Sequence, residues 1–384
     1  MTSNKLTFEK VKEAYHKTYV IEDPTIIKTL YAHYISFQIH ADPIWLIVTG
    51  PSGGLKSELL NSFSKCKYIH CLSTITPNTF ISGFKLKGGK SASYLENLSS
   101  EYPEMKGSGI ITFKDFTSIM SENDQNKTAI MGQMREIYDG KYNKGFGTGE
   151  NVDWIGKVTV LAGCTHSIHR LRQQYAAMGE RFLFYDLTQP DRWSAGHKSV
   201  ANSESGELIE KREELADLAE EYLNRTITMP EKFPKLDPKL TKTLVDLAEM
   251  ATRARSDVPR DYRSSGKEIT EVPPQEMPTR FSASLITMSK ALMVINWNEA
   301  GQMAVLDEDK NILYKMALDS ITRSRRQAMR ELSRYNVLET AGLAIKLDLP
   351  TSSLKRSIED LTALGISKRE KGSGRKGDRW MLND

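Results

Sequence analysis

A short glycine-rich segment between an apolar run and a helix constrains this chain most. The apolar run Ile44-Trp45-Leu46-Ile47-Val48 leads into Gly50-Pro51-Ser52-Gly53-Gly54-Leu55-Lys56-Ser57, and Glu58-Leu59-Leu60 follows. A buried strand, a tight turn and a helix in this order form a loop that binds phosphate through backbone N–H groups and the helix dipole. Lys56 would reach the β- and γ-phosphates of a nucleotide, and the Ser57 hydroxyl would bind Mg²⁺. The alternative interpretation is an ordinary strand-to-helix turn that happens to contain a lysine.

Leu55 is the one departure of this segment from the pattern G-x-x-x-x-G-K-[ST]. A Cβ at this position restricts φ or crowds the nucleotide, because glycine normally stands there. Gly53 and Gly54 precede it, and a shift of the loop at these two residues is one way to absorb the strain.

The composition is typical of a globular protein without membrane spans. With 384 residues, 39 % of them hydrophobic and 27 % charged, the chain is long enough for two or three domains. No apolar run approaches the roughly 18 residues of a membrane span, and residues 1–5 lack the core of a signal peptide. We therefore expect a cytoplasmic protein that does not contact a membrane. Three cysteines, Cys66, Cys71 and Cys164, lack zinc-type spacing and are expected to be buried thiols.

A second apolar run ends in an aspartate. Residues 109–113 read Gly-Ile-Ile-Thr-Phe and lead to Asp115. A carboxylate at the carboxyl end of a strand is suited to hold Mg²⁺ beside a phosphate-binding loop. Phe116 stands where a catalytic glutamate often follows, so we expect the glutamate to come from elsewhere. Glu136 is the first candidate and Glu122 the second.

A hairpin and a further strand follow. Residues 141–146 and 152–155 flank the glycine-rich segment 147–151, which predicts a β-hairpin with a glycine-rich turn. Lys141, Lys144 and Lys157 would give this hairpin a basic edge. The strand after it ends at Thr165, which would either position the attacking water next to Asp115 or serve a structural role. Arg181 precedes the next apolar strand and is suited to complete a neighbouring subunit's ATP site as an arginine finger.

The order of these motifs resembles the AAA+ ATPases of the MCM-like helicase branch. The match rests on the loop ending in Lys56, the Lys-Asp-Phe-Thr segment around Asp115, the hairpin before the Thr165 strand, and Gly-Glu-Arg-Phe at Arg181. Within this branch the chain resembles the compact MCM-related ATPases of bacterial phages and mobile elements, over roughly residues 10–325. Asp257-Val258-Pro259-Arg260-Asp261 and Glu276-Met277-Pro278-Thr279-Arg280 extend the resemblance.

The resemblance implies an α/β AAA+ fold, in which a P-loop parallel sheet carries a hairpin before the sensor 1 strand and is followed by a helical lid. Arg280 would then be the sensor 2 arginine at the head of that lid. The group forms rings, commonly hexamers, that bind ATP and Mg²⁺ and grip DNA in the central channel. Lys141 and Lys144 would be the DNA contacts. The departures at Leu55 and Phe116 bear on the rate of hydrolysis more than on nucleotide binding.

Four units are expected along the chain. They are an N-terminal helical brace (1–40), the ATPase core (41–190), a linker with the helical lid (191–325) and a C-terminal DNA-binding domain (326–384). Residues 189–206 are expected to be a connection, with helices at 207–224 and 238–256. A single helix is expected from Asp307 to about Ser333.

The tail is basic and has the pattern of a winged helix–turn–helix. Residues 323–384 contain 14 Lys and Arg against eight Asp and Glu, although the net charge of the chain is only +4. A helix N-capped by Thr351 would bury Leu354, Ile358, Leu361 and Leu364 and stop at Gly365. The predicted DNA contacts are Lys355 and Arg356 on this helix and Lys371, Arg375 and Lys376 on the wing. The alternative is a winged helix used for protein contact or ring packing.

The sequence therefore predicts a ring-forming, ATP-dependent DNA helicase or translocase that serves replication of a phage or mobile element. An alternative is a nucleotide-switched DNA-binding regulator, or a helicase loader, with weak ATPase activity. Leu55 and Phe116 favour the nucleotide-switched regulator.

Overall fold

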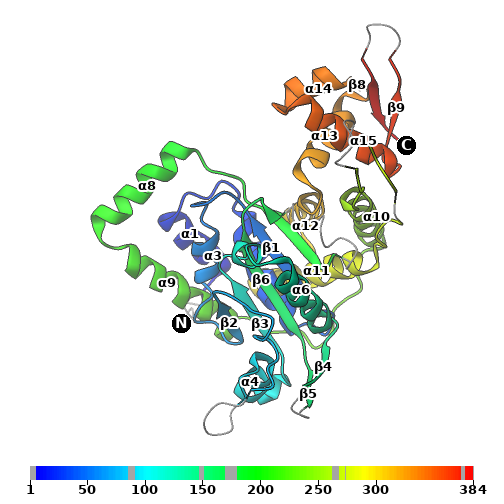
Figure 1. The fold of residues 1–384 in the computed structure, drawn as a ribbon. Helices are drawn as coiled ribbons and strands as arrows, with labels where there is room; N and C mark the ends of the chain where they lie inside the picture. The colour runs from blue at the N-terminus through cyan, green and yellow to red at the C-terminus, as the bar shows by residue number, and fades with distance from the viewer. Residues whose placement is uncertain are drawn as a thin grey trace.

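The computed structural model describes residues 6–84, 91–146, 151–168, 180–261, 268–272, 274–372 and 377–383. A five-stranded, all-parallel sheet in the order β2-β3-β6-β1-β7 lies at its centre (Figure 1). The strands are β1 (Trp45–Thr49), β2 (Ile69–Leu72), β3 (Gly109–Phe113), β6 (Val158–Cys164) and β7 (Phe182–Asp186). With helices on both faces, the chain has the expected mixed α/β class with a parallel sheet.

The strands are continuous apolar runs because helices cover the sheet on both sides. Every residue of β1, β3 and β6 is buried. On one face α2 (Thr25–Gln38) packs against β3 and the long helix α11 (Thr279–Ala300). On the other face α6 (Asp124–Tyr138) buries Ile130, Met134 and Ile137 against the sheet. The segment expected as a separate brace thus contributes α2 to the main core.

The other helices are α1 (Phe8–Thr18), α3 (Lys56–Asn61), α4 (Tyr94–Glu101), the 3₁₀ turn Pro103–Met105, α5 (Thr117–Met120), α8 (Arg192–Ser205), α9 (Leu208–Glu220), the π-helical turn Glu221–Thr226, α10 (Pro238–Arg255), α12 (Asp307–Asp319), α13 (Arg323–Tyr335), α14 (Thr340–Leu347) and α15 (Thr351–Ala363).

Three local expectations were wrong. The predicted connection at 189–206 contains the fourteen-residue helix α8, which Asp191 caps by accepting a hydrogen bond from the Ser194 N–H at 2.8 Å. The single helix expected from Asp307 is two helices, α12 and α13, separated by residues 320–322. Cys66 and Cys164 are buried as expected, but Cys71 is exposed.

The predicted hairpin is present. Strands β4 (Lys141–Gly145) and β5 (Asn151–Ile155) pair antiparallel, with Lys141 opposite Ile155, and they project from the body beside the start of β6 (Figure 1). Trp154 anchors β5 by donating a hydrogen bond from its indole N–H to the Gly107 carbonyl at 3.0 Å.

The C-terminal residues form a small α/β module. Helices α13, α14 and α15 pack beside a three-stranded sheet ordered β8-β10-β9, with β8 (Leu338–Glu339), β9 (Ser367–Glu370) and β10 (Arg379–Leu382). The predicted stripe Leu354, Ile358, Leu361 and Leu364 is fully buried. Thr351 is the first residue of α15 rather than its cap, which is Pro350. Gly365 follows α15 at φ 72°, a left-handed conformation that glycine adopts without cost.

None of the helices in the described part of the chain is long and apolar enough to cross a membrane.

Candidate functional site

The glycine-rich loop lies at the carboxyl edge of the sheet, between its two neighbouring strands. The Gly50 N–H donates to the Cys164 carbonyl at 3.2 Å, and the Leu187 N–H donates to the Thr49 carbonyl at 2.9 Å. Since β6 and β7 flank β1 in parallel register, the residues after each strand surround the loop. This edge is where open α/β sheets bind their ligands.

Lys56 is held within the loop. Its ammonium is buried and donates hydrogen bonds to the Gly50 and Pro51 carbonyls at 3.0 and 2.6 Å. Burial lowers the pKa of Lys56, whereas the charge of Asp115 acts in the opposite direction. Ser57 follows at the start of α3 and its hydroxyl is 3.4 Å from the Lys114 carbonyl. Both side chains face the strand end that carries Asp115.

Leu55 occupies a backbone conformation that favours glycine. Its φ is 63° and its ψ is −8°, immediately before α3 begins. A left-handed conformation costs a residue with a Cβ roughly 1–2 kcal/mol. Gly53 also has a positive φ, 74°, which fits its residue type. The loop therefore keeps the glycine-type backbone at position 55 and carries the strain, rather than shifting it to the preceding glycines.

Asp115 and Thr165 lie at the same edge on adjacent strands. The Phe116 N–H donates to the Gly163 carbonyl at 2.8 Å, which ties the two strand ends together. Asp115 accepts a hydrogen bond from the Thr117 N–H at 2.9 Å, and Thr165 shares a hydrogen bond with Ser167 at 2.6 Å. No three His, Cys, Asp or Glu side chains gather into a metal site among the described residues. A Mg²⁺ ion at Ser57 and Asp115 would thus take its other ligands from phosphate and water.

The glutamate candidates lie at different ends of the sheet. Phe116 is buried and stacks edge-on against Phe113 and Phe182, so this position belongs to the core. Glu136 lies near the end of α6, where its charge, after burial, helps to raise the pKa of Tyr142 in the hairpin. Helix α6 runs back across the sheet, so Glu136 is not brought to the loop. Glu122 precedes α6, on the side of Asp115, and accepts a hydrogen bond from Asn126 at 2.9 Å.

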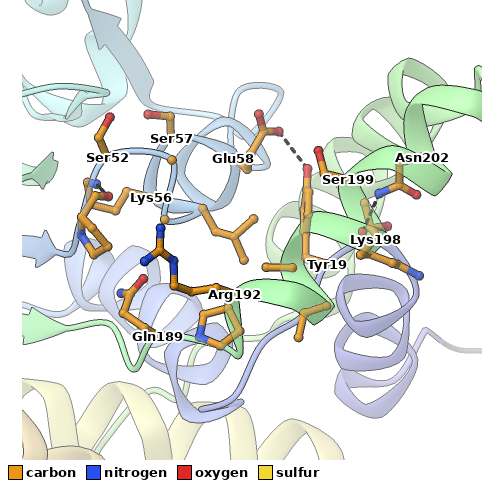
Figure 2. Close-up of a pocket in the computed structure, with 18 of the residues that line it drawn as sticks. Tyr19, Ser52, Lys56, Ser57, Glu58, Gln189, Arg192, Lys198, Ser199 and Asn202 are labelled. Carbon is orange, nitrogen blue, oxygen red and sulfur yellow. Dashed lines mark hydrogen bonds between the residues drawn. The ribbon is translucent and has the colours of Figure 1, made fainter.

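A cavity of about 830 Å³ lies between the loop and α8 (Figure 2). Its walls are the loop itself, the end of α1 at Thr18–Val20, residues Gln189 and Pro190 after β7, and one face of α8. Sequence reasoning missed the α8 wall, which takes the place of the expected connection. A smaller, mainly apolar pocket lies next to it between Val20, Ile21, Leu187 and Pro190.

Arg181 and Arg280 lie together at the opposite edge of the sheet. Arg181 precedes β7 by one residue, and its guanidinium packs 5.3 Å from the Tyr138 ring centroid and 3.4 Å from the Asp139 carboxylate. Burial lowers the pKa of Arg181; Asp139 opposes this and the neighbouring Arg280 adds to it. Arg280, in the first turn of α11, has a buried Nη1 that donates to no described group. Five strand residues separate Arg181 from the loop edge, a distance of about 15 Å.

The hairpin lysines do not share a face. Lys141 is exposed beside Asn143, whereas Lys144 lies on the other side of β4 with its ammonium 5.1 Å from the Phe146 ring. Lys157, expected on the same basic edge, is instead half-buried and donates hydrogen bonds to the Ser36 and Ile39 carbonyls at 3.2 and 2.7 Å. Burial lowers the pKa of Lys157 to about 8. The three lysines therefore do not form the single basic edge that was expected: Lys157 is half-buried, and Lys141 and Lys144 lie on opposite sides of β4.

Some of the side chains predicted to contact DNA in the C-terminal module are accessible to solvent. Lys355 is exposed and Lys371 is exposed after β9. Arg356 is half-buried and its Nε donates to the Ser352 carbonyl at 3.0 Å. Arg375 and Lys376 lie outside the described residues.

A charged junction, which sequence reasoning missed, connects the strand ends to the C-terminal module. Asp186 at the end of β7 contacts His166 at 2.7 Å and Arg326 of α13 at 2.9 Å. Asp319 of α12 joins the junction by contacting Lys315 at 2.9 Å and pairing with Arg326. Burial alone would raise the pKa of Asp186, but His166 and Arg326 outweigh burial and hold it far below its usual range.

Comparison with protein families and with curated proteins finds no family model and no sequence that matches this chain.

Proposed function

We propose that this chain is a ring-forming AAA+ ATPase that couples ATP hydrolysis to movement along DNA or to its unwinding. One observation carries the proposal: the loop with Lys56, Asp115 and Thr165 is at one edge of the sheet, and Arg181 with Arg280 is about 15 Å away at the other. An arginine side chain cannot span that distance. Two copies in head-to-tail contact would bring the two halves together, as a closed ring requires.

Within the proposed site each residue has a distinct role. Lys56 leaves the loop carbonyls to bind the β- and γ-phosphates, and Ser57 and Asp115 hold Mg²⁺. Thr165 orients the attacking water. Glu122 takes the place of the glutamate excluded at Phe116, because it lies on the Asp115 side of α6 whereas Glu136 does not. Arg181 and Arg280 of the adjoining copy stabilise the charge that develops in the transition state.

The DNA contacts in this proposal come from two surfaces. The hairpin β4–β5 lines the channel of a hexamer and contacts the strand through Lys141 and Lys144. The C-terminal module is a winged helix that binds duplex DNA through α15 and the wing, with Lys355 and Lys371 as accessible cations.

The test is unwinding of a forked duplex and ATP turnover, each measured with and without single-stranded DNA. We expect DNA-stimulated turnover and unwinding by the wild type, and a loss of at least about a hundredfold in Lys56→Ala because the phosphate contact is removed. Lys242→Ala, which removes an exposed lysine from α10, is the matched control and should leave both rates unchanged. Equal activity in Lys56→Ala and wild type would contradict the proposal.

A nucleotide-controlled DNA-binding switch is the second candidate. The strained Leu55 and the buried Phe116 favour it, because neither residue supports fast hydrolysis. Tight ATP binding that alters DNA affinity, without turnover above background, would identify the switch.

A further inference from the structure

Helix α8 forms a cover over the loop. Its residues Arg192, Ala195, Lys198, Ser199 and Asn202 recur at helical spacing and all line the cavity. The opposite face points to solvent, where Trp193 is 78 % exposed. The face turned towards the cavity is polar and cationic, unlike the apolar stripe of a helix that packs on a core.

The cover is fixed to the same elements that hold the loop. Asn202 is buried and its side-chain N–H donates to the Thr18 carbonyl at 2.9 Å. Arg212 of α9 makes a two-pronged contact with Glu58 at 2.7 and 2.6 Å, and the Tyr19 hydroxyl donates to Glu58 at 2.8 Å. Glu58 directly follows Ser57 in α3. The position of α8 is therefore tied to the helix that begins at Lys56.

Arg192 extends from the start of α8 towards the loop (Figure 2). Its side chain forms no hydrogen bond or ion pair with any described residue. Glu58 is the single carboxylate among the residues that line this cavity, and Arg212 and Tyr19 already occupy it. The cavity thus contains the cations Lys56, Arg192 and Lys198 without an available anion. A guanidinium in this position has the geometry and charge to bind phosphate oxygens.

We propose that Arg192 binds the phosphate chain of a nucleoside triphosphate in the same subunit as Lys56, so that α8 forms the wall of the site that faces the loop. This inference rests on the proposed nucleotide site. It adds a phosphate-binding side chain that comes from neither the loop nor the neighbouring subunit. Arg192 would contact the phosphates from the α8 side of the cavity, and the backbone N–H groups of residues 52–57 would contact them from the loop side.

The test is equilibrium binding of a fluorescent ATP analogue to the full-length protein. Arg192→Ala should weaken binding about 10- to 100-fold, because a charge-assisted hydrogen bond to phosphate is lost. Arg192→Lys should retain much of the affinity, and Arg192→Glu should lose more than Arg192→Ala. Arg225→Ala, which removes an exposed arginine outside the cavity, is the matched control and should bind like wild type. Thermal unfolding should be the same in all four variants, since Arg192 supports no other described residue.

Two failures are distinguishable. If wild type binds the analogue, Lys56→Ala does not, and Arg192→Ala binds like wild type, the role of Arg192 is wrong while the nucleotide site stands. If wild type and Lys56→Ala both fail to bind, or bind equally, the cavity is not a nucleotide site and both proposals fall.

Discussion

Leu55 has the left-handed backbone conformation of a glycine, although it departs from the sequence pattern G-x-x-x-x-G-K-[ST]. Its φ of 63° is the value that glycine adopts freely, so the loop has preserved its backbone at the cost of local strain. Its side chain packs partly against the main core, which offsets some of that cost. The sequence alone predicted the site of strain but not whether the loop would shift to relieve it.

The substitution Leu55→Val tests this strain. A β-branched residue is disfavoured further in the left-handed region, so we expect a loss of about 2 kcal/mol in the free energy of unfolding, measured by urea denaturation. Leu55→Gly should remain within about 1 kcal/mol of wild type, because relief of strain offsets the entropy of the unfolded glycine. The matched control Leu318→Val, on an exposed position of α12, should cost less than about 1 kcal/mol. Equal losses in the two valine variants would show that Leu55 is not strained.

His33 gives the protein a specific sensitivity to acid. It is buried in α2 and its Nε2 is 3.1 Å from the Ile44 carbonyl. Burial lowers the pKa of His33 from 6.5 to about 4. Between these values the unfolded chain binds a proton that the folded chain does not, so stability falls as the pH falls from about 6.5 to about 4.

The difference in the free energy of unfolding between wild type and His33→Gln isolates the pH dependence that His33 contributes. Urea unfolding at several pH values should show a shallower loss of stability in the variant across that window. His16→Gln, at an exposed position of α1, serves as control and should follow the wild-type curve. A His33→Gln curve parallel to wild type would contradict the buried, neutral histidine.

At the scale of elements, the sequence predicted the strands of the sheet and the glycine-rich loop better than the helices that lie next to them. β1, β3 and β6 come from mostly apolar runs of the kind that buried parallel strands have, and their carboxyl ends bring Asp115 and Thr165 to the loop. Helix α8 was missed because its inner face lines a cavity and its outer face is exposed, so it has no apolar stripe. Asp191 and Gly206, residues typical of a helix start and a helix end, were the sequence signals for α8.

Glu136 was misplaced because the position of a residue in a helix does not reveal the edge of the sheet at which that helix ends.

The junction around Arg326 is the element-scale feature with the clearest energetic consequence. Arg326 neutralises Asp186 and Asp319, and its neighbour Arg325 contacts Asp360 of α15 at 3.0 Å. Helix α13 therefore joins the strand end beside Thr165 to the helix that carries Lys355. Direct contacts thus connect the carboxyl edge of the sheet, where the loop lies, to the C-terminal module.

We expect Arg326→Ala to cost about 3 kcal/mol in the free energy of unfolding, because it leaves two largely buried carboxylates with less compensation. Arg334→Ala breaks the exposed pair with Glu331 on the same helix and should cost less than about 1 kcal/mol. Both losses are to be measured by urea denaturation at pH 7. A loss in Arg326→Ala no larger than in Arg334→Ala would show that the junction does not hold the module in place.

At the scale of the whole molecule, the proposed site is divided between two edges of the sheet, so the proposal requires an assembly of at least two copies. One copy presents the loop, Asp115, Thr165 and the α8 cover, and the arginine pair Arg181 and Arg280 is turned away from them. We propose that a second copy completes the site. Mixing two variants, each inactive in a different half of the site, tests this.

The most direct test mixes two inactive variants, Lys56→Ala and Arg181→Ala, and measures ATP turnover. Each variant alone should be inactive, because every interface lacks one half of the site. In an equimolar mixture about a quarter of the interfaces should join an intact loop to an intact arginine, so about a quarter of wild-type turnover should return. If the mixture remains as inactive as its components, or if Arg181→Ala alone retains wild-type turnover, the shared site is wrong.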